Sequence, residues 1–174
     1  DFRLDGSFYS SDGVKAVKHL QQWAGKKMEK LDPLCSVANL FNGPRFPRVY
    51  VDEPDKGVPF LSSSDILFTD LTNVRLLSKK YTSAELIKNL RFKKGWTLIS
   101  CSGTIGNTAY VRQDMAHMTG SQHIMRAAPK EGTIPPGYLY AFLSSRIAYT
   151  LLTQGTYGAV IQHIEPQHIK NLPV

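Results

Sequence analysis

Few side chains in this sequence have the types and spacing that chemistry requires. Ser102 stands before Gly103, but no glycine stands two positions earlier, so the Gly-x-Ser-x-Gly pattern of a hydrolase nucleophile is absent. Of the five histidines, His163 and His168 are the closest pair, and Pro166 interrupts the helix that two metal ligands would share. Neither Gly-x-x-x-x-Gly-Lys-Ser/Thr nor Gly-x-Gly-x-x-Gly occurs, so a nucleotide site has no motif support. We therefore expect no catalytic residue, no metal ion and no cofactor in this chain.

The cysteines and the length of the chain limit what kind of protein this is. Cys35 and Cys101 lie far apart without zinc-type spacing, which is typical of free thiols in a reducing cytoplasm. The 174 residues, 42% of them hydrophobic, are enough for one domain with its own core. No charged-then-apolar leader is present, and no apolar run approaches the ~18 residues of a membrane span. We expect a single domain over residues 1–174, cut from a longer cytoplasmic protein, with no membrane partner.

The positive charge of the chain is concentrated in one short span. Residues 1–74 carry 9 basic and 10 acidic side chains, residues 75–94 carry 7 and 1, and residues 95–174 carry 5 and 3, so the net charge of +7 divides into −1, +6 and +2. A charge run is often only a solvated face, but a one-sided run beside an exposed turn favours a polyanion such as nucleic acid. The basic side chains of this span are Arg75, Lys79, Lys80, Lys88, Arg91, Lys93 and Lys94.

The basic span leads into a glycine-bracketed segment that predicts a β-hairpin. Residues 96–100 and 107–111 are rich in β-branched and aromatic side chains, and a short polar segment separates them. Gly103 and Gly106 mark positions where the chain can take a positive φ or approach a partner closely. The exposed groups of this turn are expected to be small hydroxyls and backbone amides. Its glycines can be structural and still face a ligand.

Several other segments have the period or the end signals of helices. Apolar residues at helical spacing predict helices over residues 14–25, 32–41 and 137–154, the first with one buried stripe and the last anchoring the core. A capping box at residues 82–85 starts a helix that runs to Leu90. A proline after residue 165 opens one more short helix.

The remaining apolar runs predict strands. We expect strands at residues 49–51, 121–127 and 157–161, entry of residues 58–61 into the core, and a turn or cap at residues 62–65. Strands that alternate with helices in this way predict an α+β domain in which a mixed sheet is flanked by helices.

The order of six segments resembles the target recognition domain of type I restriction-modification specificity subunits. The central one is Gly95-Trp96-Thr97-Leu98-Ile99-Ser100 followed by Ser102-Gly103-Thr104-Ile105-Gly106. The others are residues 57–61 with 65–66, residues 121–126, 137–145, 157–161 and 169–174. Arg3-Leu4-Asp5 with Phe8-Tyr9 is similar to the lead-in of such domains, including those fused behind a methyltransferase in single-chain restriction enzymes.

This resemblance implies a reader of double-stranded DNA that performs no chemistry itself. In the family, each recognition domain reads one part of a bipartite site and positions a DNA methyltransferase subunit, and a restriction subunit is added for cleavage. S-adenosylmethionine, ATP and Mg²⁺ are then expected only on those partner subunits or domains. This chain has one domain where two are usual, so it is either half of a specificity subunit or the recognition end of a fused type II restriction-methyltransferase that reads a continuous site.

The residue types divide the expected contacts with DNA into two groups. Lysine and arginine grip phosphates, whereas side chains with paired donors and acceptors read base edges in the major groove. The candidates for phosphate contact are Arg75, Lys79, Lys80, Arg91, Lys93 and Lys94. The candidates for base reading are Arg45, Arg48, Thr104, Asn107 and Gln122.

Two other classes of protein fit the same charge distribution. A protein-interaction module could place the basic face on an acidic partner. An RNA-binding domain would stack single strands on exposed aromatic rings, for which Tyr50, Tyr81 and Trp96 are candidates. Binding to duplex DNA, single-stranded DNA and RNA distinguishes these three classes.

Overall fold

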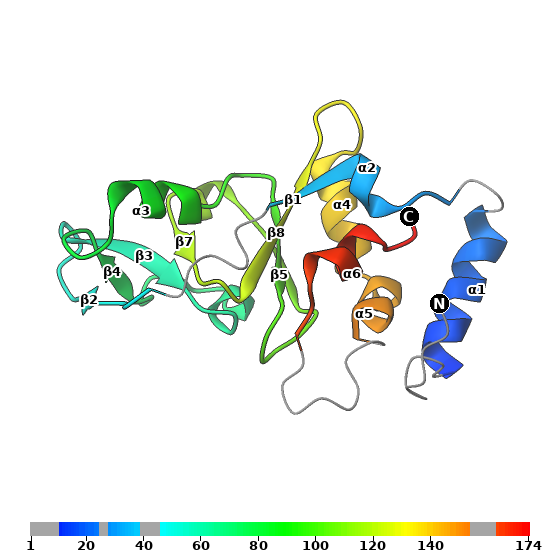
Figure 1. Cartoon of the computed structure of the whole chain (residues 1–174), viewed down its shortest axis with the longest axis horizontal. Coiled ribbons are helices and arrows are strands. Elements are labelled where there is room, and N and C mark those ends of the chain that lie inside the picture. Colours follow the sequence, from blue (N-terminus) through cyan, green and yellow to red (C-terminus); the bar gives the residue numbers. More distant parts are fainter. Residues whose placement is uncertain (1–10, 25–27, 39–45, 154–162) are drawn as a thin grey trace.

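The chain folds into two four-stranded sheets, and most of its helices lie at one end (Figure 1). The computed structural model describes residues 11–24, 28–38, 46–153 and 163–174. In order across the first sheet, the strands are β1 (Cys35–Ala38), β8 (Ile124–Pro129), β5 (Thr97–Ser100) and β6 (Thr108–Tyr110), all antiparallel. In the second sheet they are β2 (Tyr50–Val51), β4 (Leu76–Ser78), β3 (Gly57–Leu61) and β7 (Thr119–Gly120), and only the pair β3 and β7 is parallel. The α+β class is confirmed, with the strands divided between two sheets.

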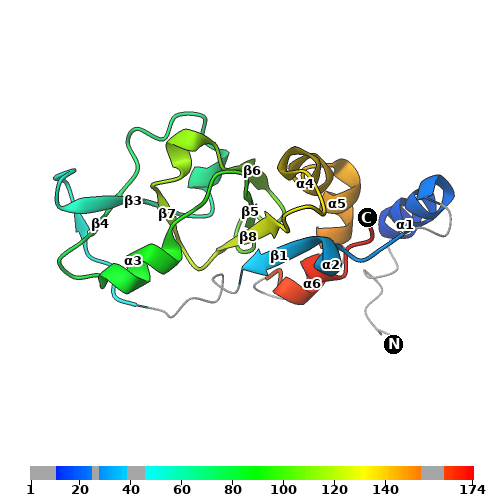
Figure 2. The same cartoon turned by 90° about the horizontal axis from the view of Figure 1, so that it is seen from above.

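The helices lie mostly around the first sheet, whereas α3 (Ala84–Leu90) lies beside β7 of the second sheet, toward the opposite end of the molecule (Figure 1). The other helices are α1 (Ser11–Ala24), α2 (Leu31–Leu34), α4 (Pro136–Leu143), α5 (Arg146–Thr153) and α6 (Pro166–Lys170), with short 3-10 helices η3 (Asp65–Leu67) and η4 (Gln113–Met115). From above, α2 and α6 lie beside β1, and α4 and α5 lie between the first sheet and α1 (Figure 2). Within the described ranges, no helix has both the length and the apolar character needed to cross a bilayer.

Strand β5 is the centre of the packing because it is buried on both faces. Ile99 joins the apolar cluster beneath α4 and α6, and its neighbour Leu98 joins a second cluster with Ile124 and with Leu61 of the other sheet. Successive residues of a strand point to opposite faces, so one short apolar strand serves both clusters. Each such leucine or isoleucine that is fully buried contributes about 1.5–3 kcal/mol. The second cluster therefore joins the two sheets.

The helix predicted over residues 32–41 is largely wrong. A single turn, α2, begins at Leu31 and ends at Leu34, and the chain then enters β1. In β1, Cys35 lies opposite Pro129 and Ala38 lies opposite Arg126 of β8. This pairing joins segments about ninety residues apart. It outweighs the local helical spacing of apolar residues, which fits a helix as well as a strand.

The long helix predicted over residues 137–154 is two helices. The Ser144 amide donates to the Tyr140 carbonyl at 2.9 Å and ends α4, whereas the Ser145 hydroxyl accepts from the Ala148 amide at 3.2 Å and caps α5. Both helices bury apolar side chains, so the apolar period continues across the break. The serine cap, a signal for a helix start, is what marks the boundary.

Helix α1 is confirmed as a helix, but its predicted buried stripe is wrong. Trp23 is 82% exposed and Val14 is 37% exposed. The helix packs against α5, and in Figure 1 it stands at the edge of the molecule. Val17 and Leu20 are half-buried, so only the middle of the stripe is covered.

Several other predicted elements are present in the structure. The helix predicted to start at the 82–85 box is α3, but its cap is Ser83 alone, through a 3.2 Å bond from the Leu86 amide, and not Thr82 of the predicted capping box. The hairpin is β5 and β6, and the turn at residues 62–65 and the short helix after Glu165 are also present. The strand predicted at 121–127 begins later, at Ile124. The strand predicted at 157–161 lies outside the described residues.

Candidate nucleic-acid interface

Two of the predicted base-reading residues touch each other. Arg48 precedes β2 and Gln122 lies in the loop between β7 and β8, and the Arg48 Nη2 donates to the Gln122 Oε1. The Arg48 guanidinium also lies 5.3 Å from the ring centroid of Phe60. The fold therefore brings together residues that are 74 positions apart in the sequence.

Aromatic rings connect this pair to one of the predicted phosphate contacts. The Phe60 ring lies 6.1 Å from that of Tyr50, and the Arg75 guanidinium lies 4.9 Å over Tyr50. Cation–π contacts hold both guanidinium groups without neutralising their charge. Arg75 and Arg48 thus lie on one run of side chains along the second sheet.

Two histidines extend the same run in the opposite direction. The Gln122 Nε2 lies 3.2 Å from the His123 Nε2, and the rings of His123 and His163 stack with centroids 6.1 Å apart. Sequence reasoning assigned neither histidine a role, because forty residues separate them and only tertiary pairing brings them together. Apart from the buried Phe60, which links Tyr50 to Arg48, we call the six side chains of this run the polar strip: Arg75, Tyr50, Arg48, Gln122, His123 and His163.

The backbone after β5 fixes the two histidines. The Cys101 amide donates to the His123 carbonyl at 3.0 Å, and the Cys101 carbonyl accepts from the Ile164 amide at 3.1 Å. Ser102 and His163 form an antiparallel bridge. One short extension of the hairpin therefore holds both segments in register.

Two further base-reading candidates, Thr104 and Asn107, have bonds within the hairpin turn. The Thr104 hydroxyl lies 3.0 Å from the Ser100 hydroxyl and 3.4 Å from the Ser63 carbonyl. The Asn107 side-chain Nδ2 donates to the Thr104 carbonyl at 2.9 Å. The structure gives both residues a role in shaping the turn, and Thr104 remains exposed.

Both turn glycines have the positive φ expected of them, +77° at Gly103 and +82° at Gly106. Their surroundings differ. A Cβ on Gly106 would lie 3.0 Å from the Tyr149 ring of α5, whereas a Cβ on Gly103 would meet no atom within 4 Å. Gly106 is buried against the Tyr149 ring, so the partner that this glycine approaches closely is helix α5.

The basic span does not adjoin the turn, contrary to the expectation from sequence order. Residues 91–94 connect α3 to the start of β5, and the turn follows the end of that strand. Lys79 donates from Nζ to the Asp55 carbonyl at 2.8 Å, and Lys93 lies 5.7 Å from the Trp96 ring. Of the predicted phosphate contacts, Arg75 belongs to the polar strip, while Lys79, Lys80, Arg91, Lys93 and Lys94 lie in the turn after β4 and in the connection to β5. Arg45 lies outside the described residues.

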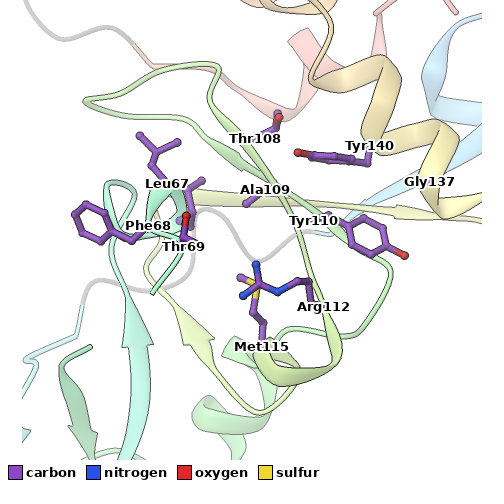
Figure 3. Close-up of a pocket in the computed structure, with 11 residues that line it drawn as sticks. Leu67, Phe68, Thr69, Thr108, Ala109, Tyr110, Arg112, Met115, Gly137 and Tyr140 are labelled. Atoms are coloured by element: carbon purple, nitrogen blue, oxygen red, sulfur yellow. The ribbon is translucent and has the colours of Figure 1, made fainter. Parts of the chain in front are cut away.

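A groove of about 520 Å³ beside β6 has a different chemistry (Figure 3). Leu67 and Phe68 form one side, Tyr140 of α4 lies on the other, and Arg112 with Met115 closes the lower end in this view. Arg112 is paired with Asp114 at 2.9 Å, and this bond lowers the pKa of the Asp114 carboxyl. Leu67 and Phe68 are 48% and 59% exposed. An apolar groove whose cation is already paired is less suited to phosphates than the polar strip is.

Neither thiol of the chain is activated as a nucleophile. Cys35 and Cys101 are free and buried, and burial raises the pKa of each from 9.0 to about 11. In the described ranges, no group of three or more His, Cys, Asp or Glu side chains is arranged to hold a metal ion.

A family described as "Type I restriction modification DNA specificity domain" matches residues 25–174. Among solved structures, the chain is similar to one from a study of complex assembly and conformational transition of the type I R-M system, with a TM-score of 0.62 and 14% identity over 93% of this chain and 40% of that chain. It is also similar to the HsdS subunit from Thermoanaerobacter tengcongensis, with a TM-score of 0.57 and 12% identity over 94% of this chain and 39% of that chain. The chain thus spans about two fifths of the length of these structures. No curated protein sequence matches it significantly.

Proposed function

The chain belongs to the family of type I restriction modification DNA specificity domains, and from this premise we propose that it reads one part of a double-stranded DNA target and directs a methyltransferase to it. Membership in the family implies recognition of a DNA sequence within a restriction-modification system. The family's domain is a recognition module, and the chemistry belongs to other subunits or domains.

The observation that carries the proposal is the polar strip, and above all the contact between Arg48 and Gln122. Arginine can donate two bonds to the O6 and N7 of guanine, and glutamine can bond the N6 and N7 of adenine. In the free chain Arg48 Nη2 bonds Gln122, whereas the buried Arg48 Nε has no hydrogen-bond partner among the described residues. On DNA the two side chains would each exchange the other for a base edge, at little cost in further unpaired polar groups.

Affinity would come from Arg75 on the strip and from exposed cations elsewhere on the surface. Arg75 lies on the strip, and Lys93 and Lys94 lie exposed on the connection into β5. Each phosphate that such a side chain neutralises releases counterions, which favours binding to any duplex. Base contacts at Arg48 and Gln122 then select among sequences.

The methylating and cleaving activities belong to the proposed partners. A DNA methyltransferase subunit or domain would bring S-adenosylmethionine, and a restriction subunit or domain would bring ATP and Mg²⁺. The parent protein would be either a specificity subunit with a second recognition domain or a fused enzyme that reads one continuous site. Duplex DNA is the ligand of this domain in both cases.

The test is a chimera in which this domain replaces a recognition domain of a complete type I assembly. Methylation mapped across a genome should move to sites with a new half-sequence, while the other half stays fixed. The same chimera with Arg48→Ala and Gln122→Ala should lose the preference at one or two base pairs, each worth about 1–3 kcal/mol. A folded and active chimera that kept the original site would overturn the proposal and favour the protein-interaction module.

A further inference from the structure

We propose that Phe46 and Phe60 are positioning residues, which orient the Arg48 guanidinium so that its two terminal nitrogens read a guanine. This inference rests on the proposed function and deepens it, because it names the base that Arg48 selects and the groups that hold the side chain in place. The Cζ of Arg48 lies 5.3 Å from the ring centroid of Phe60 and 5.8 Å from that of Phe46. Two aromatic rings thus contact one cation that is proposed to read DNA.

The Phe60 ring is held by the second sheet. Phe60 lies in β3, is 0% exposed and belongs to an apolar cluster with Leu77 and Leu90. Its amide donates to the Arg75 carbonyl at 2.9 Å, and Phe46 packs against the same cluster from outside. DNA cannot reach a fully buried ring. Phe60 can therefore influence base reading only through the arginine that lies over it.

The segment before β2 turns Arg48 toward these rings. Phe46, Arg48 and Tyr50 are half-buried, whereas the two residues between them are exposed. This alternation is that of an extended chain, in which every second side chain points to the same side. The Val49 carbonyl accepts from the Ser78 amide at 2.9 Å, and this bond fixes the segment beside β4. The backbone therefore directs Arg48 onto the sheet and not into open solvent.

The ring contacts can persist when Arg48 changes its hydrogen-bond partner. On DNA the bond from Nη2 to Gln122 is exchanged for a base edge, so this bond cannot hold the guanidinium in the complex. A cation–π contact uses no hydrogen-bond donor, and it leaves the N–H groups of the arginine available. Orientation by Phe46 and Phe60 is thus compatible with base reading, whereas orientation by Gln122 is not.

The burial of Nε selects the base. The Nε of Arg48 is buried and has no hydrogen-bond partner among the described residues, so this edge of the guanidinium faces the protein. Only the two terminal nitrogens are left to contact a base. Guanine offers the acceptor pair O6 and N7 in the major groove, which two arginine donors can bond together. The other bases lack this pair of acceptors.

The experiment starts by enriching DNA duplexes from a random pool on the complete chain. Affinity is then measured for the enriched duplex and for each of its single base-pair changes. Arg48→Ala identifies the base pair that Arg48 reads, because this variant should lose the preference there and keep the preferences at other positions. That base pair should be G·C, and the lost preference should be about 5- to 150-fold.

Phe60→Leu and Phe46→Leu keep an apolar side chain but remove the ring. Each should reduce the preference for guanine at that one base pair by about twofold or more, as expected for a lost cation–π contact. Preferences at the other positions and affinity for an unrelated duplex should not change. In the Arg48→Ala background both substitutions should have no effect on any preference. Phe46→Tyr retains the ring and should keep the preference for guanine.

Phe92→Leu is the matched control. Phe92 is 1% exposed and its ring lies 5.3 Å from the Arg126 guanidinium, so it is as buried as Phe60 and also lies against an arginine. It does not contact the polar strip through Arg48, so this variant should lower the melting temperature and leave every base preference unchanged. Circular dichroism verifies that each variant is folded, and Phe46, being half-buried, is the safer of the two rings to remove.

The outcomes separate this inference from the proposed function. Folded Phe60→Leu and Phe46→Leu variants that keep the guanine preference, or that weaken all preferences alike, would overturn the positioning role and leave DNA reading intact. Preferences that all survive Arg48→Ala, or a base pair other than G·C at the position it identifies, would overturn the guanine assignment while the chain still reads DNA. A chain that enriches no sequence would overturn the proposed function and this inference with it.

Discussion

Arg126 donates from Nη2 to the carbonyl oxygen of Leu90 at 2.9 Å, so a fully buried cation on β8 bonds the last residue of α3. Its guanidinium also lies 5.3 Å from the Phe92 ring. Within the described residues, its Nε and Nη1 have no partner and no ion pair reaches it. Burial lowers the pKa of Arg126 to about 10.

The first prediction follows from this balance of costs. Arg126→Met removes the desolvation cost of the charge but also the bond to Leu90, which is worth about 1.5–3 kcal/mol, so the free energy of unfolding should change by less than about 1.5 kcal/mol at neutral pH. Arg126→Ala also leaves a cavity and should lose about 3 kcal/mol. Urea unfolding of the three proteins measures both differences.

The lowered pKa of Arg126 also predicts how the stability difference between the unmodified chain and Arg126→Met changes with pH. The folded state releases the Arg126 proton at lower pH than the unfolded state does, so above about pH 10 unfolding takes up a proton. Relative to Arg126→Met, the unmodified chain should therefore gain stability as the pH rises above about 10. A difference that stays constant there would show that the guanidinium is well solvated.

A second prediction compares the two turn glycines. Gly103→Ala and Gly106→Ala both force a side chain into the left-handed region, at a cost of about 1–2 kcal/mol. Gly106→Ala must also displace the Tyr149 ring, 3.0 Å from the new Cβ, and should be the less stable variant in thermal melts. Equal melting temperatures would show that α5 yields to the added methyl group.

A third prediction concerns the thiols. Because burial raises the pKa of Cys35 and Cys101 to about 11, the thiolate fraction near neutral pH should be about 100-fold below that of an ordinary cysteine. Iodoacetamide followed by mass spectrometry should modify both residues only after denaturation. The raised pKa contributes stability that is complete below pH 9.0 and declines as the pH approaches 11. Rapid modification of the native chain would contradict the buried positions.

A fourth prediction concerns the basic span. If most cations of the span contact phosphates, a log–log plot of duplex affinity against salt concentration should have a slope of roughly −4 to −6. The double variant Lys93→Glu with Lys94→Glu should reduce the magnitude of this slope by about 2. Binding to all sequences should weaken alike. Lys15→Glu with Lys18→Glu makes the same charge change on α1, at the far end of the molecule in Figure 1, and should have a smaller effect. Equal losses from both pairs would mean that net charge, not position, determines affinity.

The elements that could be predicted from sequence are those with local causes. Ser83 caps α3 through its own hydroxyl, and the two glycines of the hairpin turn adopt the positive φ that glycine favours. The class of fold followed from the interleaving of such elements. In these places the nearest neighbours in sequence are also the bonding partners.

The elements that could not be predicted depend on distant partners. Residues 35–38 form a strand because they pair with β8, and nothing in their own sequence predicts a strand. The polar strip has the same origin, since Arg48, Gln122 and His163 come from three separate segments. Residue type selected Arg48 and Gln122 as candidates, but it could not indicate that they touch or that two histidines continue the run.

The hairpin turn has a fixed half and a free half. Ile105 and Gly106 are buried against the body of the chain, whereas Gly103 and Thr104 are exposed at the tip. A mutant library confined to Thr104 would vary the surface beside Ser63 at the cost of the Thr104 hydroxyl bonds, whereas the positive φ of Gly103 favours glycine at that position. One extended to Gly106 would lose most of its members to unfolding before any could be screened. Substitutions at Thr104 should therefore be tolerated better than substitutions at Ile105 or Gly106.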